Sequence, residues 1–178
     1  MKRRNLTAVV FVLFVFILIF IERGPWSSAA VATYNHSYGT FDMKSYHTDT
    51  VYQVLDQMEA AGLDVYKKYL IGDSLFTVIY CILQLLLQSY AFQWSRSKLL
   101  QRTLFLLPVT RMLLDLIENT ALHYILQEYP QRLHALVSFS SIVTKTKLIL
   151  VGLWPCVLIT GFIIYLIKRR RPVNQAIG

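Results

Sequence analysis

The segment RMLLDLIENTALH (residues 111–123) decides the fold, because it places ionisable side chains in the middle of the apolar run 103–127. At about 1.5 Å per residue, a helix of this length is long enough to cross a bilayer. Residues three or four apart share one side of a helix, so the polar groups form a single stripe. The members of this stripe are Arg111, Asp115, Glu118, Asn119 and His123.

This polar stripe requires other helices around it. A charged side chain in hydrocarbon costs at least about 2.5 to 3.5 kcal/mol, so the stripe must face protein or an internal cavity. Further long apolar runs supply the partners. The sequence therefore predicts an all-α fold, a four-helix transmembrane bundle whose spans are residues 5–21, 70–92, 103–127 and 145–167, with a partly helical outside loop over 22–69.

Composition agrees with one membrane domain over residues 1–178. The chain is 55% hydrophobic and its mean hydropathy is +0.46, which is too apolar for an ordinary soluble domain. No repeat of the length typical of solenoids is present, and no low-complexity linker divides the chain. We therefore expect a multi-pass protein whose first partner is the lipid bilayer.

The net charge of +8 indicates membrane topology. Ten of the eighteen Lys and Arg residues fall in the stretches 2–4, 96–102 and 168–171, which contain no acidic residue. Clusters of this kind mark cytoplasmic segments, so both termini are expected in the cytoplasm of a protein of the cell membrane. Aromatic rows with loop lysines, which would suggest nucleic acid, are lacking.

The first span and the outside loop leave alternatives open. Ala30-Val31-Ala32 resembles a signal-peptide cleavage site, although the charged gap before it favours an uncleaved anchor. Residues 31–43 suggest a short strand or an ordered coil. A short helix is expected from Thr48 or Asp49 to a stop at Gly62.

Further expectations concern two helix starts and the two cysteines. Asp64 is expected to cap the second span, and Pro130 to start the fourth helix. Cys81 and Cys156 lie in apolar runs and are expected to be buried, inert thiols. A disulfide between them is the rarer alternative.

One outer-half cluster follows from the predicted depths of the polar residues. Asp73 lies about one turn below the outer end of the second span, and Lys147 reaches the same level from the fourth helix. Close carboxylates in such a site disfavour each other's ionisation, which suits proton or cation handling. The alternative is a network that only fixes helix packing. The predicted ligand-binding cluster is Asp73, Arg111, Asp115, Glu118, Asn119, His123 and Lys147.

Several sharper chemistries lack their motifs. There is no H-E-x-x-H helix, no G-x-S-x-G elbow and no C-x-x-C pair. Glu118 stands five residues from His123, not at the Glu-x-x-His spacing of di-metal bundles. No metal and no cofactor are therefore expected.

A set of residues spread over the predicted spans forms a further pattern: Gly62, Tyr66 or Tyr69, Asp73, Phe76, Tyr80, Leu107, Pro108, Asp115, Glu118, Asn119, Thr144 and Lys147. Over residues 49–167 this set resembles a pattern in small bacterial four-helix integral membrane proteins of unassigned function. Thr77 departs from it, standing where the pattern has a proline. The resemblance implies the same topology and the same cluster, and it carries no activity.

Three functions are open at this stage. The leading hypothesis is a membrane protein that binds or moves a small polar ligand, a cation or protons at the cluster. The second is an enzyme of the outer leaflet, with Asp115 or Glu118 as general base and Arg111 or Lys147 holding an anionic group such as a lipid phosphate. The third is an accessory subunit with a structural polar core. A homo-oligomer or a larger membrane partner is compatible with each, and the sequence favours a protein that is not an enzyme.

Overall fold

The computed structural model describes residues 3–170, whose regular secondary structure is helical with no strand, as the all-α prediction requires. Lys2 and Arg171, two members of the basic stretches, lie outside these residues. The helices are α1 (Arg3–Arg23), α2 (Ser28–Thr33), α3 (Thr48–Leu55), α4 (Ala60–Ala91), α5 (Lys98–Glu128) and α6 (His134–Arg170).

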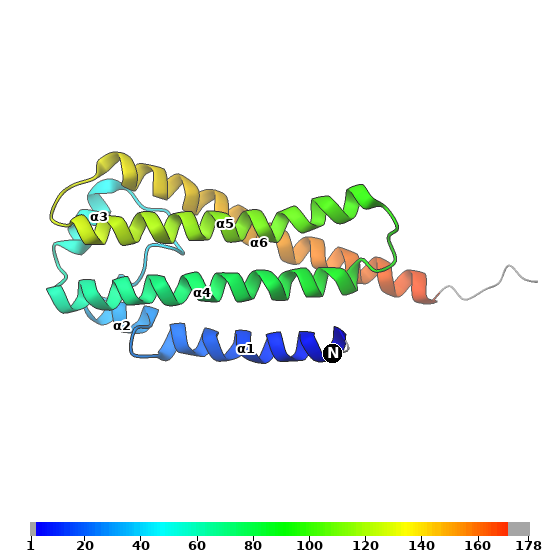
Figure 1. Cartoon of the computed structure of the whole chain (residues 1–178). Helices are drawn as coiled ribbons and strands as arrows, with labels where there is room; N and C mark the ends of the chain where they lie inside the picture. The colour runs from blue at the N-terminus through cyan, green and yellow to red at the C-terminus, as the bar shows by residue number, and fades with distance from the viewer. Residues whose placement is uncertain (1–2, 171–178) are drawn as a thin grey trace, which may run out of the picture.

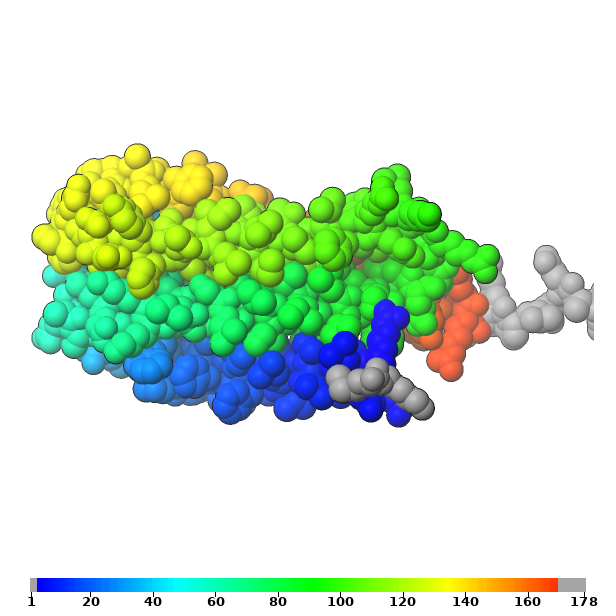
Figure 2. Space-filling view, viewed as in Figure 1, coloured from blue at the N-terminus to red at the C-terminus, as the bar shows by residue number. Residues whose placement is uncertain are grey.

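The four long helices run side by side (Figure 1). Helix α4 packs against α1 on one side and against α5 on the other, and α6 packs on α5 and α4. The short helices α2 and α3 lie together at one end of the bundle, while the start of α1, the α4–α5 connection and the end of α6 lie at the other end (Figure 1). In the space-filling view, α1 lies along α4 on the face away from α5 (Figure 2).

Three of these helices are long and apolar enough to cross a membrane: α1 with the residues up to Thr33, α4, and α6. Helix α5 is of similar length, with 31 residues, but Arg111, Asp115 and Glu118 interrupt its apolar character. The expectation of several membrane-type helices is therefore confirmed for three segments.

The exterior of the bundle is apolar. Large hydrophobic side chains are exposed along the long helices, among them Phe16 at 68%, Ile71 at 63% and Ile149 at 69%. Many polar and charged side chains are buried instead. This reversal of the usual soluble pattern is the one expected of a protein whose outer surface meets lipid.

Two predicted helix boundaries on the outside loop are wrong. Helix α4 already begins at Ala60, so the end of the expected loop 22–69 is helical. Glu59 occupies the N-cap position, and Asp64 lies within the helix, paired with Lys68 at 2.6 Å. Gly62 does not stop a helix, because α3 has already ended at Leu55. The packing of the start of α4 against other segments thus outweighs the local capping signal of Asp64.

Other local expectations also differ from the structure. The region 31–43 forms part of α2 and then turns, with no strand. Helix α6 begins at His134, later than Pro130. Both thiols are free, and Cys81 is buried as predicted, but Cys156 is exposed on the apolar exterior. A disulfide is therefore not formed.

The segment 34–47 folds into the end of the bundle where α2 and α3 lie, and aromatic side chains pack it there. Phe41 is 1% exposed, and its backbone N–H donates to the hydroxyl of Tyr66 at 2.7 Å. The ring of Phe41 lies 5.3 Å from that of Tyr46. Buried aromatic pairs of this kind contribute much of the stability of a protein core, so this segment is packed into the fold.

A matched pair of glycine variants tests this packing. A Cβ at Gly62 would lie 2.6 Å from Cβ of Tyr34, whereas a Cβ at Gly152 meets nothing within 4 Å. We expect Gly62→Ala to destabilise the protein by about 1 to 3 kcal/mol through overpacking. Gly152→Ala should leave the melting temperature in detergent unchanged or raise it slightly, because alanine favours the helix. Equal melting temperatures for the two variants would contradict the α2–α4 contact.

Candidate functional site

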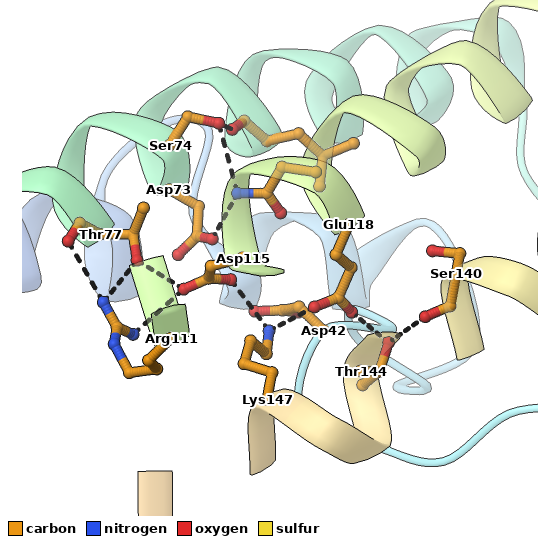
Figure 3. A network of polar contacts seen from close by, with 12 residues as sticks. Asp42, Asp73, Ser74, Thr77, Arg111, Asp115, Glu118, Ser140, Thr144 and Lys147 are labelled. Atoms are coloured by element: carbon orange, nitrogen blue, oxygen red, sulfur yellow. Dashed lines mark hydrogen bonds and ion pairs between the residues drawn. The ribbon is translucent and has the colours of Figure 1, made fainter. Parts of the chain in front are cut away.

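The half of the bundle nearer to α2 and α3 contains a buried network of charged and polar side chains from α4, α5 and α6 (Figure 3). The structure brings together all but one of the residues that the sequence predicted. Those that it joins by hydrogen bonds or ion pairs are Asp73, Arg111, Asp115, Glu118, Asn119 and Lys147.

Asp115 is the centre of the network. Its Oδ1 lies 3.0 Å from Nζ of Lys147 on α6. Its Oδ2 lies 3.2 Å from Nη1 of Arg111 and accepts from the Thr77 hydroxyl at 2.6 Å. The carboxylate thus joins all three helices while only 5% of the residue is exposed.

Arg111 is fixed by α4. Its Nη2 donates to the hydroxyl of Thr77 at 2.6 Å and to the Thr77 carbonyl at 3.2 Å. The guanidinium also lies over the ring of Tyr80, 4.7 Å from the centroid. A planar cation held by two hydrogen bonds, an ion pair and an aromatic face has little freedom to turn toward a new ligand.

Lys147 bridges the two carboxylates of α5. Its Nζ lies 2.6 Å from Oε2 of Glu118 in addition to its contact with Asp115. The other oxygen of Glu118 accepts from the hydroxyl of Thr144 at 2.5 Å. The polar stripe on α6 therefore faces α5 and completes the network.

Asp73 differs from the other carboxylates. It accepts a hydrogen bond of 2.8 Å from Nδ2 of Asn119, and it is 6% exposed. Within residues 3–170, no lysine or arginine lies within ion-pair distance of it. Its charge is therefore not compensated by an ion pair within the described residues.

Asp42 is a fourth buried carboxylate, which the sequence analysis missed. It lies in the segment 34–47 beside the network (Figure 3) and is 4% exposed. It accepts a hydrogen bond from the hydroxyl of Tyr69 at 3.0 Å. The aromatic residues around it were the only signal in the sequence, since a loop has no periodicity to show which side chains turn inward.

Tyr46 of the same segment covers the network on the side of α6. Its hydroxyl donates to Ser140 at 2.7 Å, and its carbonyl accepts from Ser141 at 2.6 Å. Burial raises the pKa of Tyr46 to about 12. The phenol therefore remains a neutral donor over the whole physiological range.

His123 is not part of the network. It is half-buried and lines a lateral groove of about 380 Å³ between α4 and α5, with Ser74, Asn119 and Thr120 among the other lining residues. Asn119 connects the two regions, because its Nδ2 bonds to Asp73 while its side chain also lines the groove. Its buried Oδ1 finds no partner within residues 3–170.

The charges of the site do not balance. Two cations, Arg111 and Lys147, stand against the carboxylates of Asp42, Asp73, Asp115 and Glu118, and each of these residues is at most 6% exposed. Two positive minus four negative charges leave −2 when every group is ionised. Over the described part of the chain, no group of three or more His, Cys, Asp or Glu side chains is arranged to hold a metal ion.

The fold and the site define an all-helical protein with three helices of membrane type and a buried ion-pair network. Comparison of the chain with protein-family models, with curated proteins and with solved structures gives no match. The resemblance to small bacterial four-helix membrane proteins therefore stays a prediction.

Two neutralising variants separate the roles of the carboxylates. We expect Asp115→Asn to destabilise the protein by about 3 to 5 kcal/mol, because it leaves buried cations without their shared partner. Asp73→Asn removes uncompensated charge, so it should melt at or above the wild-type temperature. Thermal unfolding in detergent measures both. A larger loss for Asp73→Asn than for Asp115→Asn would contradict this assignment of ion pairs.

Proposed function

We propose that the chain crosses a membrane four times, with α5 as a full span and both termini in the cytoplasm. Helix α5 has enough residues to cross a bilayer, and its charged side chains are paired with α4 and α6. Its opposite face exposes apolar residues, including Phe105 at 54% and Leu113 at 50%. Pairing inside the bundle offsets the cost that charges would carry in lipid.

This topology is tested by labelling single cysteines in a chain whose Cys81 and Cys156 are replaced by alanine. The variants Asp64→Cys and Lys98→Cys place an exposed thiol at opposite ends of the bundle. We expect a membrane-impermeant maleimide, added to intact cells, to label position 64 and not position 98. Labelling of position 98 from outside would show that the proposed orientation is wrong.

We further propose that the network binds a monovalent positive charge, a proton or a metal cation. The observation that carries this proposal is the excess of two carboxylates among the buried groups. Burying a charge that has no partner costs roughly several kcal/mol of stability. Binding a positive charge would remove part of this cost. Asp73 is the favoured acceptor, because within the described residues it forms no ion pair and its hydrogen-bond partner Asn119 lines the lateral groove, whereas Tyr69, which donates to Asp42, does not.

The lateral groove supports the same proposal, because it reaches the side chain that holds Asp73. Asn119 lines this groove and donates to the carboxylate, and its own Oδ1 is left without a partner in the described residues. His123 lines the groove as well, and an imidazole is suited to pass protons near neutral pH. The groove provides the route by which the positive charge reaches Asp73.

The other two functions fit the contacts less well. A general base needs a free lone pair and access to substrate, but Asp115 and Glu118 are both held by Lys147 and are at most 5% exposed. A purely structural network is most stable when its charges cancel, which these do not. Binding of positive charge is therefore the better-supported function.

Infrared spectroscopy of the protein in lipid tests the proposal. We expect a C=O stretching band of a protonated carboxyl group at neutral pH. Sodium or potassium ions that compete with the proton for the site should reduce the intensity of this band. Asp73→Asn should abolish the band. Asp64→Asn is the matched control, because Asp64 lies on the same helix but is exposed and already paired with Lys68.

Two results would show that the proposal is wrong. The first is a wild-type protein with no such band whose spectrum and melting temperature do not respond to sodium or potassium. The second is a band that persists both in Asp73→Asn and in Asp42→Asn; within the described residues, Asp42 is the other carboxylate of the network that forms no ion pair.

A further inference from the structure

A second site lies at the opposite end of the bundle from the charged network. Helices α4 and α5 and the start of α1 enclose a pocket of about 480 Å³ beside the α4–α5 connection. Figure 2 shows the start of α1, in dark blue, reaching across α4 toward α5 at this end. The polar residues that line the pocket are Arg3, Gln88, Ser89, Gln93 and Gln101.

Gln88 gives this pocket the character of a binding site. The residue is 4% exposed, and neither its Oε1 nor its Nε2 has a hydrogen-bond partner within the part of the chain that the structure describes. Buried amides are almost always hydrogen-bonded, because an unsatisfied one loses its interactions with water without replacement. A ligand group in the pocket would supply the missing partner.

The charge of the surroundings indicates an anionic ligand. The guanidinium of Arg3 lies over the ring of Tyr90, 4.6 Å from its centroid, which holds the cation at the pocket. A second hollow shares Gln101 with the pocket and adds Lys98 and Arg102. None of the residues lining either hollow is acidic.

The remaining walls are apolar. Leucine and phenylalanine side chains of α4 and α5, such as Leu85 and Phe105, line the pocket on the side of the spans. A cation and amides next to an apolar wall match a molecule with a charged head and a hydrocarbon chain. In the proposed topology this end lies at the level of the cytoplasmic lipid headgroups.

We propose that this pocket binds the phosphate group of an anionic phospholipid from the cytoplasmic leaflet. Arg3 pairs with the phosphate, the Gln88 amide donates to a phosphate or ester oxygen, and one acyl chain lies along the apolar wall. The site rests on the proposed membrane crossing, but not on the binding of positive charge at Asp73.

Native mass spectrometry of the full chain, released from detergent, tests the site with phosphatidylglycerol and with phosphatidylcholine of the same chains. Both lipids carry the phosphate, but the quaternary ammonium of phosphatidylcholine would lie beside Arg3, Lys98 and Arg102, where no acidic residue lines the hollows. We therefore expect the wild type to retain the anionic lipid about tenfold more tightly than the neutral one. Arg3→Gln should remove most of this preference, and Gln88→Leu should lower the retention of both lipids.

Lys168→Gln is the matched control. Lys168 lies over the ring of Trp94 at 4.1 Å, so the change removes a second cation from the same end of the protein and from a similar aromatic contact. It is not among the residues that line the pocket, and lipid retention should stay at the wild-type level. Gln88→Leu should not lower the melting temperature, because the amide has no partner in the described chain to lose.

Three outcomes would overturn the lipid site. These are equal retention of both lipids by the wild type, wild-type retention of both lipids by both pocket variants, and displacement of the bound lipid by an excess of inorganic phosphate. The last would mark a site for free anions. The infrared band of the Asp73 carboxyl, measured on Gln88→Leu, reports separately on the charged network.

Discussion

The contact of Lys147 with Asp115 and Glu118 is the interaction on which the rest of the structure depends. One ammonium group from α6 holds both carboxylates of α5, and the second oxygen of Asp115 then fixes Arg111. Arg111 in turn reaches Thr77 on α4. A single chain of ion pairs and hydrogen bonds therefore joins three helices. The outer surfaces of these helices are apolar, and apolar contacts alone would not select one arrangement of the helices over another.

The two ends of the bundle differ because this network lies in only one half of it. At the end where α2 and α3 lie, the segment 34–47 packs its aromatic residues over the network, and Tyr46 bonds to Ser140 of α6. At the other end, α4 and α5 are joined through the 92–97 connection and leave an open pocket, where the buried amide of Gln88 has no hydrogen-bond partner within the described residues. One end of the bundle is thus closed by packed side chains, and the other contains a pocket.

The sequence predicted the helices and most of the site because both depend on local spacing. Asp115 and Asn119 follow Arg111 at steps of four residues, which keeps them near one face of α5. Each such step overshoots a full turn by about 40°, so after three steps His123 has rotated about 120° away from Arg111. This drift explains why His123 faces the groove. Asp42 and the early start of α4 depend on contacts between distant segments, which spacing does not encode.

The spacing of the network along the sequence has a consequence for the order in which the fold closes. Lys147 lies 32 residues after Asp115, and only the connection of residues 129–133 separates α5 from α6, so their ion pair can form as soon as these two neighbouring helices meet. The segment 34–47 closes over the network only when Tyr46 contacts Ser140 and Ser141, 94 and 95 residues further along the chain. Because contacts between distant segments close longer loops, an early segment of the chain is expected among the last to reach its final position.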